Sequence, residues 1–103
     1  MSERGRSLEE QIAEKLLERF VGFFVSRRDG LVLVKIKVKD KTVLVWIRAS
    51  PITEKALRLY NRVASKHHFD EAWLFKLKRE ADYVSFKELE ERFTRTILSL
   101  EEF

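Results

Sequence analysis

The chain has 103 residues, of which 45% are hydrophobic and 37% charged, and its formal net charge is +4. This length suits one compact domain, and the composition is that of a core under an ionic surface rather than of a disordered chain. The lack of cysteine excludes disulfides, thiolate metal sites and a cysteine nucleophile. No apolar run approaches the roughly 20 residues of a transmembrane helix, and no signal-peptide core is found. We therefore expect a soluble, cytoplasmic single domain over 1–103, with 1–6 flexible and no membrane partner.

Charge is unevenly distributed along the chain. Residues 27–48 carry seven basic and two acidic side chains, whereas residues 80–103 carry three basic and seven acidic ones. Two surfaces of different charge are therefore expected. Glutamate far outnumbers aspartate, lysine and arginine are plentiful and amide residues are scarce, a mix that is typical of thermophiles and indicates a thermophilic, archaeal source.

A first helix is predicted to begin after Ser7. Ser7 and Glu10 have the spacing of a capping box, in which each side chain bonds a free backbone N–H of the first helical turn. Apolar residues then recur at helical spacing from Leu8 to Phe20.

Three strands are predicted next. The stretch "VGFFVSR" (21–27) is rich in β-branched and aromatic residues and is followed by the turn dipeptide Asp29-Gly30. Residues 31–39 and 43–48 alternate with the period of a strand and flank Asp40-Lys41. We expect these three strands to be antiparallel.

The hairpin predicted around Asp40-Lys41 has two different faces. If this dipeptide is a two-residue loop, one face is wholly apolar, with Val34, Ile36, Val38, Val43, Val45 and Ile47. The other face then pairs Lys37 with Leu44, Lys35 with Trp46, and Leu33 with Arg48.

The second half of the chain predicts a helix, a strand and a further helix. "SPITEKALRLYNRVASKHH" (50–68) begins with a capping serine and a proline. "DEAWLFKLK" (70–78) reads as a strand, and "YVSF" (83–86) as a short edge strand. Ser85 and Glu88 form another capping box before an apolar period that reaches Leu100. A helical crossover makes the third and fourth strands parallel, so we expect an α/β (α+β) fold with a mixed sheet flanked by helices.

This order, with "VKIKVKDKTVLVWIRAS" leading into a helix and then "FDEAWLFKLK", resembles the restriction-endonuclease-like PD-(D/E)XK nuclease superfamily, nearest to archaeal Holliday junction resolvases. The resemblance covers roughly residues 7–78 and implies an α-β-β-β-α-β core, to which the C-terminal helix is added. In that family an acidic residue on the second strand and an E-x-K triplet on the third hold divalent cations. Those positions fall near Leu33 and on Trp46-Ile47-Arg48. The resemblance therefore implies a degenerate site, with no catalytic residue, metal or cofactor.

Other metal-binding arrangements are poorly supported. Asp29 and Asp40 lie in predicted turns, where aspartate is favoured for its turn chemistry. His67 and His68 are adjacent, so on a helix they diverge by about 100° and cannot both bind one metal. An active metal-dependent nuclease stays an alternative, with a displaced site built from Glu10, Glu14 and Asp29 or Asp40.

A basic patch with an aromatic residue is the main candidate site. Lysine and arginine beside an exposed tryptophan would suit phosphate-backbone binding with base stacking. The residues predicted to bind nucleic acid, DNA rather than RNA, are Arg27, Arg28, Lys35, Lys37, Lys39, Trp46, Arg48 and Lys55. The alternative is that the lysines only keep the strand soluble and that Trp46 packs beneath a helix.

The C-terminal helix offers a second candidate surface. Leu98, Leu100 and Phe103 exceed what a terminal helix needs to cover a sheet, so they are predicted to form a homodimer or partner interface. The alternative is that they dock on the chain's own sheet. The leading hypothesis is a non-catalytic nucleic-acid-binding domain, of which an accessory to a DNA-processing enzyme is one form, and the alternative is a protein-interaction or assembly subunit.

Overall fold

The computed structural model describes residues 7–28, 30–76 and 92–97. In chain order the elements are α1 (Leu8–Arg19), β1 (Gly22–Arg28), β2 (Leu31–Val38), β3 (Lys41–Arg48), α2 (Glu54–Ala64), β4 (Glu71–Lys76) and β5 (Arg95–Ile97). No helix within these ranges is long and apolar enough to cross a membrane.

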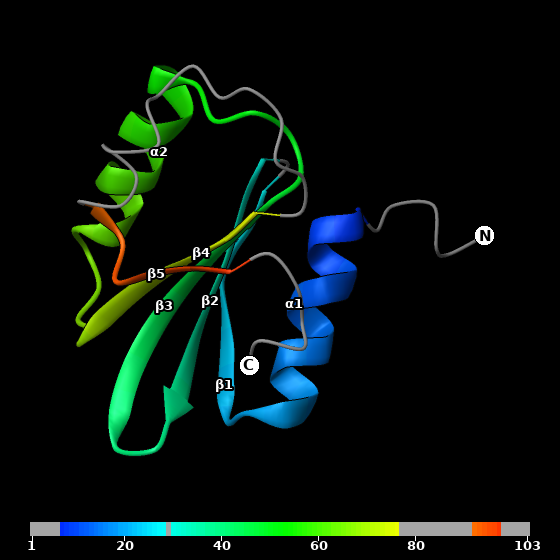
Figure 1. The fold of residues 1–103 in the computed structure, drawn as a ribbon, viewed down its shortest axis with the longest axis vertical. Helices are drawn as coiled ribbons and strands as arrows, with labels where there is room; N and C mark the ends of the chain where they lie inside the picture. Colours follow the sequence, from blue (N-terminus) through cyan, green and yellow to red (C-terminus); the bar gives the residue numbers. More distant parts are fainter. Residues whose placement is uncertain (1–6, 29, 77–91, 98–103) are drawn as a thin grey trace.

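The strands form one sheet in the order β1-β2-β3-β4-β5. β1, β2 and β3 pair antiparallel, whereas β4 pairs parallel to β3 and β5 parallel to β4. α2 is the crossover between β3 and β4, and the two helices lie on opposite faces of the sheet (Figure 1). The predicted α+β class and the mixed sheet are therefore confirmed.

The helices begin where side chains cap them. The Ser7 hydroxyl accepts a hydrogen bond from the Glu10 backbone N–H at 3.1 Å, as the capping box predicts. α2 begins later than predicted, because Thr53 and not Ser50 is its N-cap and accepts from the Ala56 N–H at 3.0 Å. The predicted start at Ser50-Pro51 is wrong since the Pro51 carbonyl is engaged by an arginine of β3.

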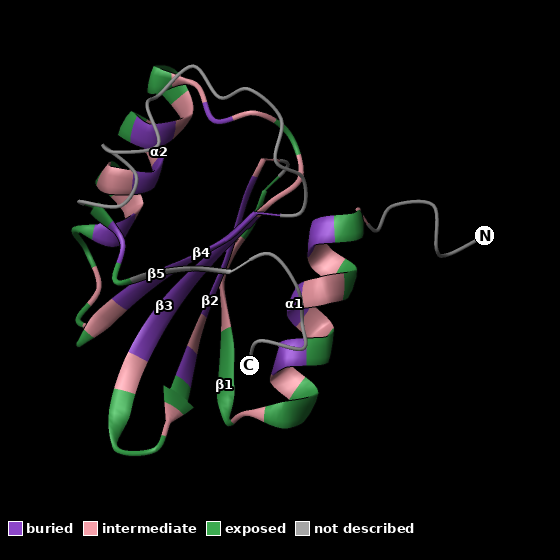
Figure 2. Ribbon diagram, viewed as in Figure 1, coloured by how far each residue is buried: buried purple, intermediate pink, exposed green. Residues whose placement is uncertain are grey.

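Apolar layers cover both faces of the central strands (Figure 2). On the α1 side, Val32, Val34, Ile36, Val43, Val45, Ile47, Trp73 and Phe75 pack with Ala13 and Leu16. On the α2 side, Leu31, Leu33, Leu44, Trp46, Ala72, Leu74, Ile52 and Phe93 pack with Leu57, Tyr60 and Ala64. Because both faces are covered, β2, β3 and β4 read as nearly continuous apolar runs.

The β2–β3 hairpin differs from its predicted register by two residues. Lys41 pairs with Val38, so the loop is Lys39-Asp40, and Lys39 adopts a φ of 58°. This register places Leu33 opposite Trp46, two apolar side chains. Since the shift is even, every residue keeps its predicted face.

The predicted C-terminal helix is wrong over its last described part. Residues 95–97 form β5, which pairs with the edge of β4 and so satisfies backbone hydrogen bonds that a bare edge would leave open. Thr96 and Ile97 are β-branched and favour a strand. Three further predictions lie outside the described residues: the start of that helix, the short edge strand "YVSF" (83–86), and the interface of Leu98, Leu100 and Phe103.

Candidate nucleic-acid interface

Trp46 belongs to the core. Its side chain is 0% exposed, and its ring stacks on that of Tyr60 with centroids 4.8 Å apart and an angle of 10° between the planes. Its indole N–H donates to the Gly30 carbonyl at 3.3 Å. The expectation that Trp46 stacks on a base is therefore wrong, and its core alternative is confirmed, because α2 covers this half of the sheet.

Arg48 has a structural role. Its Nε and Nη2 donate to the Pro51 carbonyl at 3.1 and 2.8 Å, and its Nη1 donates to the Gly30 carbonyl at 2.8 Å. These bonds tie the β1–β2 turn to the loop before α2. The expectation that Arg48 binds phosphate is therefore not supported, since its guanidinium is engaged by backbone carbonyls.

Arg27 and Arg28 are separated from the predicted patch. Arg27 lies on the α1 side, where it pairs with Glu10 at 3.1 Å and Glu14 at 3.4 Å and lies 4.1 Å from the Phe24 ring centroid. Arg28 is exposed opposite Leu31, at the end of β1 that is far from Lys37. The structure does not bring these two arginines together with the lysines of β2.

Lys35 and Lys37 remain at the surface on the α2 side, beyond the part of the sheet that α2 covers. Phe23 of β1 is the register partner of Lys35, is 55% exposed, and has its ring centroid 6.0 Å from the Lys35 ammonium. Lys37 is exposed and its backbone N–H donates to Val21. We call Phe23, Lys35 and Lys37 the lysine rim, since they combine an exposed ring with two cations.

The lysines of the hairpin loop differ from one another. Lys39 is exposed at the tip. Lys41 pairs with Glu71 at 2.8 Å, and this hydrogen bond and charge raise the pKa of Lys41. Lys39 can therefore extend the lysine rim, whereas the charge of Lys41 is already paired with the carboxylate of Glu71.

A second basic surface follows the outer side of α2, and sequence reasoning found only one of its members. Its residues are exposed, recur at a spacing of three and four and make no ion pair with any residue in the described ranges: they are Lys55, Arg58 and Arg62 of α2 and Lys66 of the turn that follows it, here called the α2 stripe. The spacing of three and four residues was the available signal. Phe23 was missed because its exposure depends on the position of β1 at the edge.

The positions that the nuclease resemblance assigns to the metal site hold core residues. Leu33 and Trp46 are register partners with 0% exposure, and Arg48 follows on the same face. Glu10 and Glu14 share Arg27, and Asp40 lies in the distant hairpin loop, while Asp29 lies outside the described residues. Within the described ranges, no three His, Asp or Glu side chains gather as a metal site would need.

The short segment between α2 and β4 carries the two histidines. His67 is half-buried and His68 is exposed, and the His67 N–H donates to the Ala64 carbonyl at the end of α2.

Comparison with known proteins assigns no role to any residue of this chain. The chain matches no protein-family model, no curated protein and no solved structure.

Proposed function

We propose that this chain is a nuclease-like domain that binds nucleic acid, DNA rather than RNA, without cleaving it. The observation that carries the proposal is the lysine rim. An exposed phenylalanine lies directly opposite Lys35 on the neighbouring strand, with Lys37 on the same face. Cations neutralise phosphates and release counterions, and an aromatic ring offers a face for a base.

The α2 stripe supports the same proposal. It lies on the helix that covers the rim's side of the sheet, so the cations of both surfaces belong to one side of the molecule. The acidic side chains of α1, by contrast, lie on the other side, where Glu10 and Glu14 hold Arg27. Among the described residues, this difference in charge between the two sides of the sheet would steer a polyanion toward the α2 side.

The arrangement of the core supports binding without metal chemistry. The α-β-β-β-α-β order agrees with the nuclease-like core that the sequence resemblance implies. At the positions of the catalytic acids and lysine, Leu33 and Trp46 fill the space and Arg48 bonds to carbonyls. A hard divalent cation needs several oxygen ligands, which these side chains do not supply.

Two charge-reversal variants test the proposal. Lys37→Glu changes the lysine rim, and Lys15→Glu makes the same change on exposed α1 on the other side of the sheet. We expect Lys37→Glu to weaken binding to a labelled DNA oligonucleotide and to reduce the slope of log affinity against log salt by about 1, while Lys15→Glu leaves both unchanged. Equal effects of the two variants, or binding that is insensitive to salt, would contradict the proposal.

A further inference from the structure

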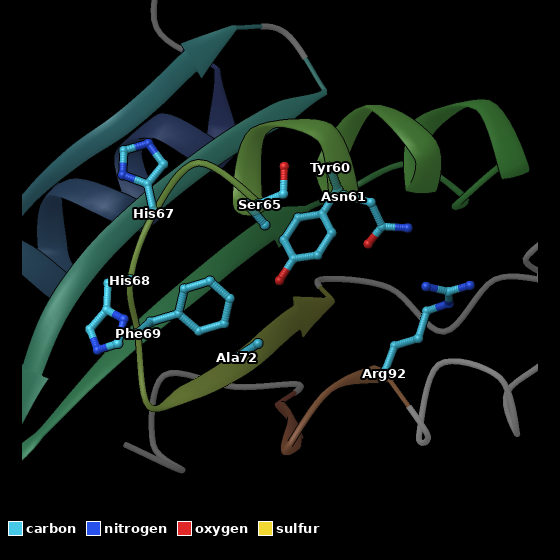
Figure 3. Close-up of a pocket in the computed structure, with 9 residues that line it drawn as sticks. Tyr60, Asn61, Ser65, His67, His68, Phe69, Ala72 and Arg92 are labelled. Carbon is cyan, nitrogen blue, oxygen red and sulfur yellow. The ribbon is translucent and has the colours of Figure 1, made fainter.

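A shallow hollow, lined by both polar and apolar side chains, opens beneath the C-terminal end of α2, on the same side of the sheet as the lysine rim. Its volume is about 470 Å³, which is within the range of small-ligand sites. Tyr60 and Asn61 of α2, Phe69 of the loop before β4, Ala72 of β4 and Arg92 line it (Figure 3).

The Tyr60 hydroxyl is directed into this hollow. Tyr60 is only 4% exposed, because Trp46 and Phe93 hold its ring at centroid distances of 4.8 and 5.1 Å. None of the residues in the described ranges hydrogen-bonds to its hydroxyl. Every polar side-chain atom that is fully buried within the described residues has a hydrogen-bond partner. Because the Tyr60 hydroxyl has none there, it is not sealed in the core and reaches the open hollow. Burial raises the pKa of Tyr60, which keeps the hydroxyl protonated as a donor.

The other lining side chains suit a planar ligand with polar edges. Figure 3 shows the Phe69 ring pointing into the hollow beside Tyr60, with Asn61 and Arg92 directed toward one another at its other end. A side-chain amide both donates and accepts, as the edge of a nucleobase does. A phenylalanine ring provides a face on which a base can stack.

The hollow and the lysine rim lie in one row across the sheet. Phe23 is opposite Lys35, Lys35 is opposite Leu44, and Leu44 is opposite Ala72. Four adjacent strands span about 14 Å. Leu44 is fully buried between them, so a ligand that reaches both must pass over the side chains that cover Leu44. A flexible single strand can do this and turn a base aside, whereas a duplex keeps its bases stacked inside and would have to flip one out.

We infer that the ligand of the lysine rim is single-stranded DNA and that the hollow takes one of its bases. The Tyr60 hydroxyl and the Asn61 amide bond the polar edge of the base, and Phe69 contacts its ring. This inference rests on the proposed function, since the rim supplies the phosphate contacts.

The test compares two ligands of equal length and charge on the full chain: a short labelled thymidine oligonucleotide and an abasic oligomer with the same sugar-phosphate backbone. We expect the wild type to bind the thymidine oligomer about tenfold more tightly. Asn61→Ala and Tyr60→Phe reduce this ratio, and the preference that remains comes from a base stacked on Phe23. Gln11→Ala, an exposed amide on α1, is the matched control and leaves the ratio unchanged. A thermal melt of each variant shows that it is folded.

The possible outcomes separate the two proposals. A thymidine preference that Asn61→Ala and Tyr60→Phe leave unchanged, with binding that still weakens in Lys37→Glu, overturns the base site and leaves the proposed function standing. Tighter binding of a duplex than of the single strand does the same. Absence of binding to every oligomer at low salt overturns both proposals, and a thymidine preference reduced only in the Asn61 and Tyr60 variants supports both.

Discussion

The indole ring of Trp46 and the phenol ring of Tyr60 stack face to face, joining the third strand to the crossover helix. Their centroids are 4.8 Å apart, and Phe93 packs against both rings at 6.1 and 5.1 Å. This aromatic group lies at the centre of the α2-side core, among Leu33, Leu44 and Leu74. The stability of the fold should depend on it.

Trp46→Ala is expected to lower the free energy of unfolding by about 3–5 kcal/mol, since it leaves a large cavity under α2. Trp46→Phe keeps a ring in this place and should cost less. Urea unfolding measures both. If Trp46→Ala costs no more than an exposed substitution such as Lys15→Ala, the core role of this tryptophan is wrong.

Arg48→Lys is expected to destabilise the protein by about 2 kcal/mol, although it conserves the charge. A lysine ammonium cannot reproduce the fork that reaches both Pro51 and Gly30. The affinity of the folded variant for DNA should stay within about twofold of that of the wild type, a change well below the loss of a phosphate contact. A large loss of affinity without a loss of stability would restore Arg48 as a binding residue.

Gly22→Ala is expected to separate β1 from β2 at the lysine rim. A Cβ at this position would overlap the Lys35 carbonyl oxygen and lie 2.9 Å from the Ile36 Cα, so the backbone of β1 must shift. The cost should be about 1–3 kcal/mol, and DNA binding should weaken because Phe23 moves from Lys35. Unfolding and binding titrations on the same sample check both effects. An unchanged free energy of unfolding would contradict the prediction that the close approach at Gly22 resists a Cβ.

Arg27→Gln is expected to change little. Its pairs with Glu10 and Glu14 are exposed on the arginine side, at 52%, and such pairs contribute about 0–1 kcal/mol. Because Arg27 lies on the α1 side, salt-dependent DNA binding should also persist. A loss of binding as large as that of Lys37→Glu would place the ligand on the opposite side of the sheet.

Because Tyr60 is buried, we expect the free energy of unfolding to fall at alkaline pH. Burial raises the pKa of Tyr60 in the folded state, whereas the unfolded chain ionises near the ordinary tyrosine value of about 10. The stabilising contribution is therefore complete below that pH and declines as the pH rises above it. Tyr60→Phe cannot ionise, so the difference in unfolding free energy between wild type and variant should shift in favour of the variant between about pH 8 and pH 11. A constant difference would contradict this.

Hydrophobic periodicity was sufficient to predict α1, the three antiparallel strands and the parallel return of β4. It failed at β5, because Phe93 and Ile97 are spaced like helical residues although the second of them pairs in the sheet. A four-residue apolar spacing does not exclude a short strand beside an open edge.

The candidate site could be predicted only in part. Alternation correctly assigned Lys35, Lys37 and Trp46 to one face, but it does not tell how much of that face a helix covers. α2 begins at Glu54 and places Tyr60 over Trp46, so the two lysines lie outside its cover. The place of Phe23 beside Lys35 depends on strand register, which the composition of β1 does not specify.

The irregular pairing of β1 also affects how copies of this protein meet. β1 is one of the two edge strands of the described sheet, its register shifts between Phe24 and Ser26, and two arginines follow at its end. A bulge and terminal cations are means by which natural sheets prevent edge-to-edge association. The strand that carries Phe23 is thus protected against polymerisation through its backbone, which permits an exposed aromatic side chain to stay at the sheet margin at high protein concentration.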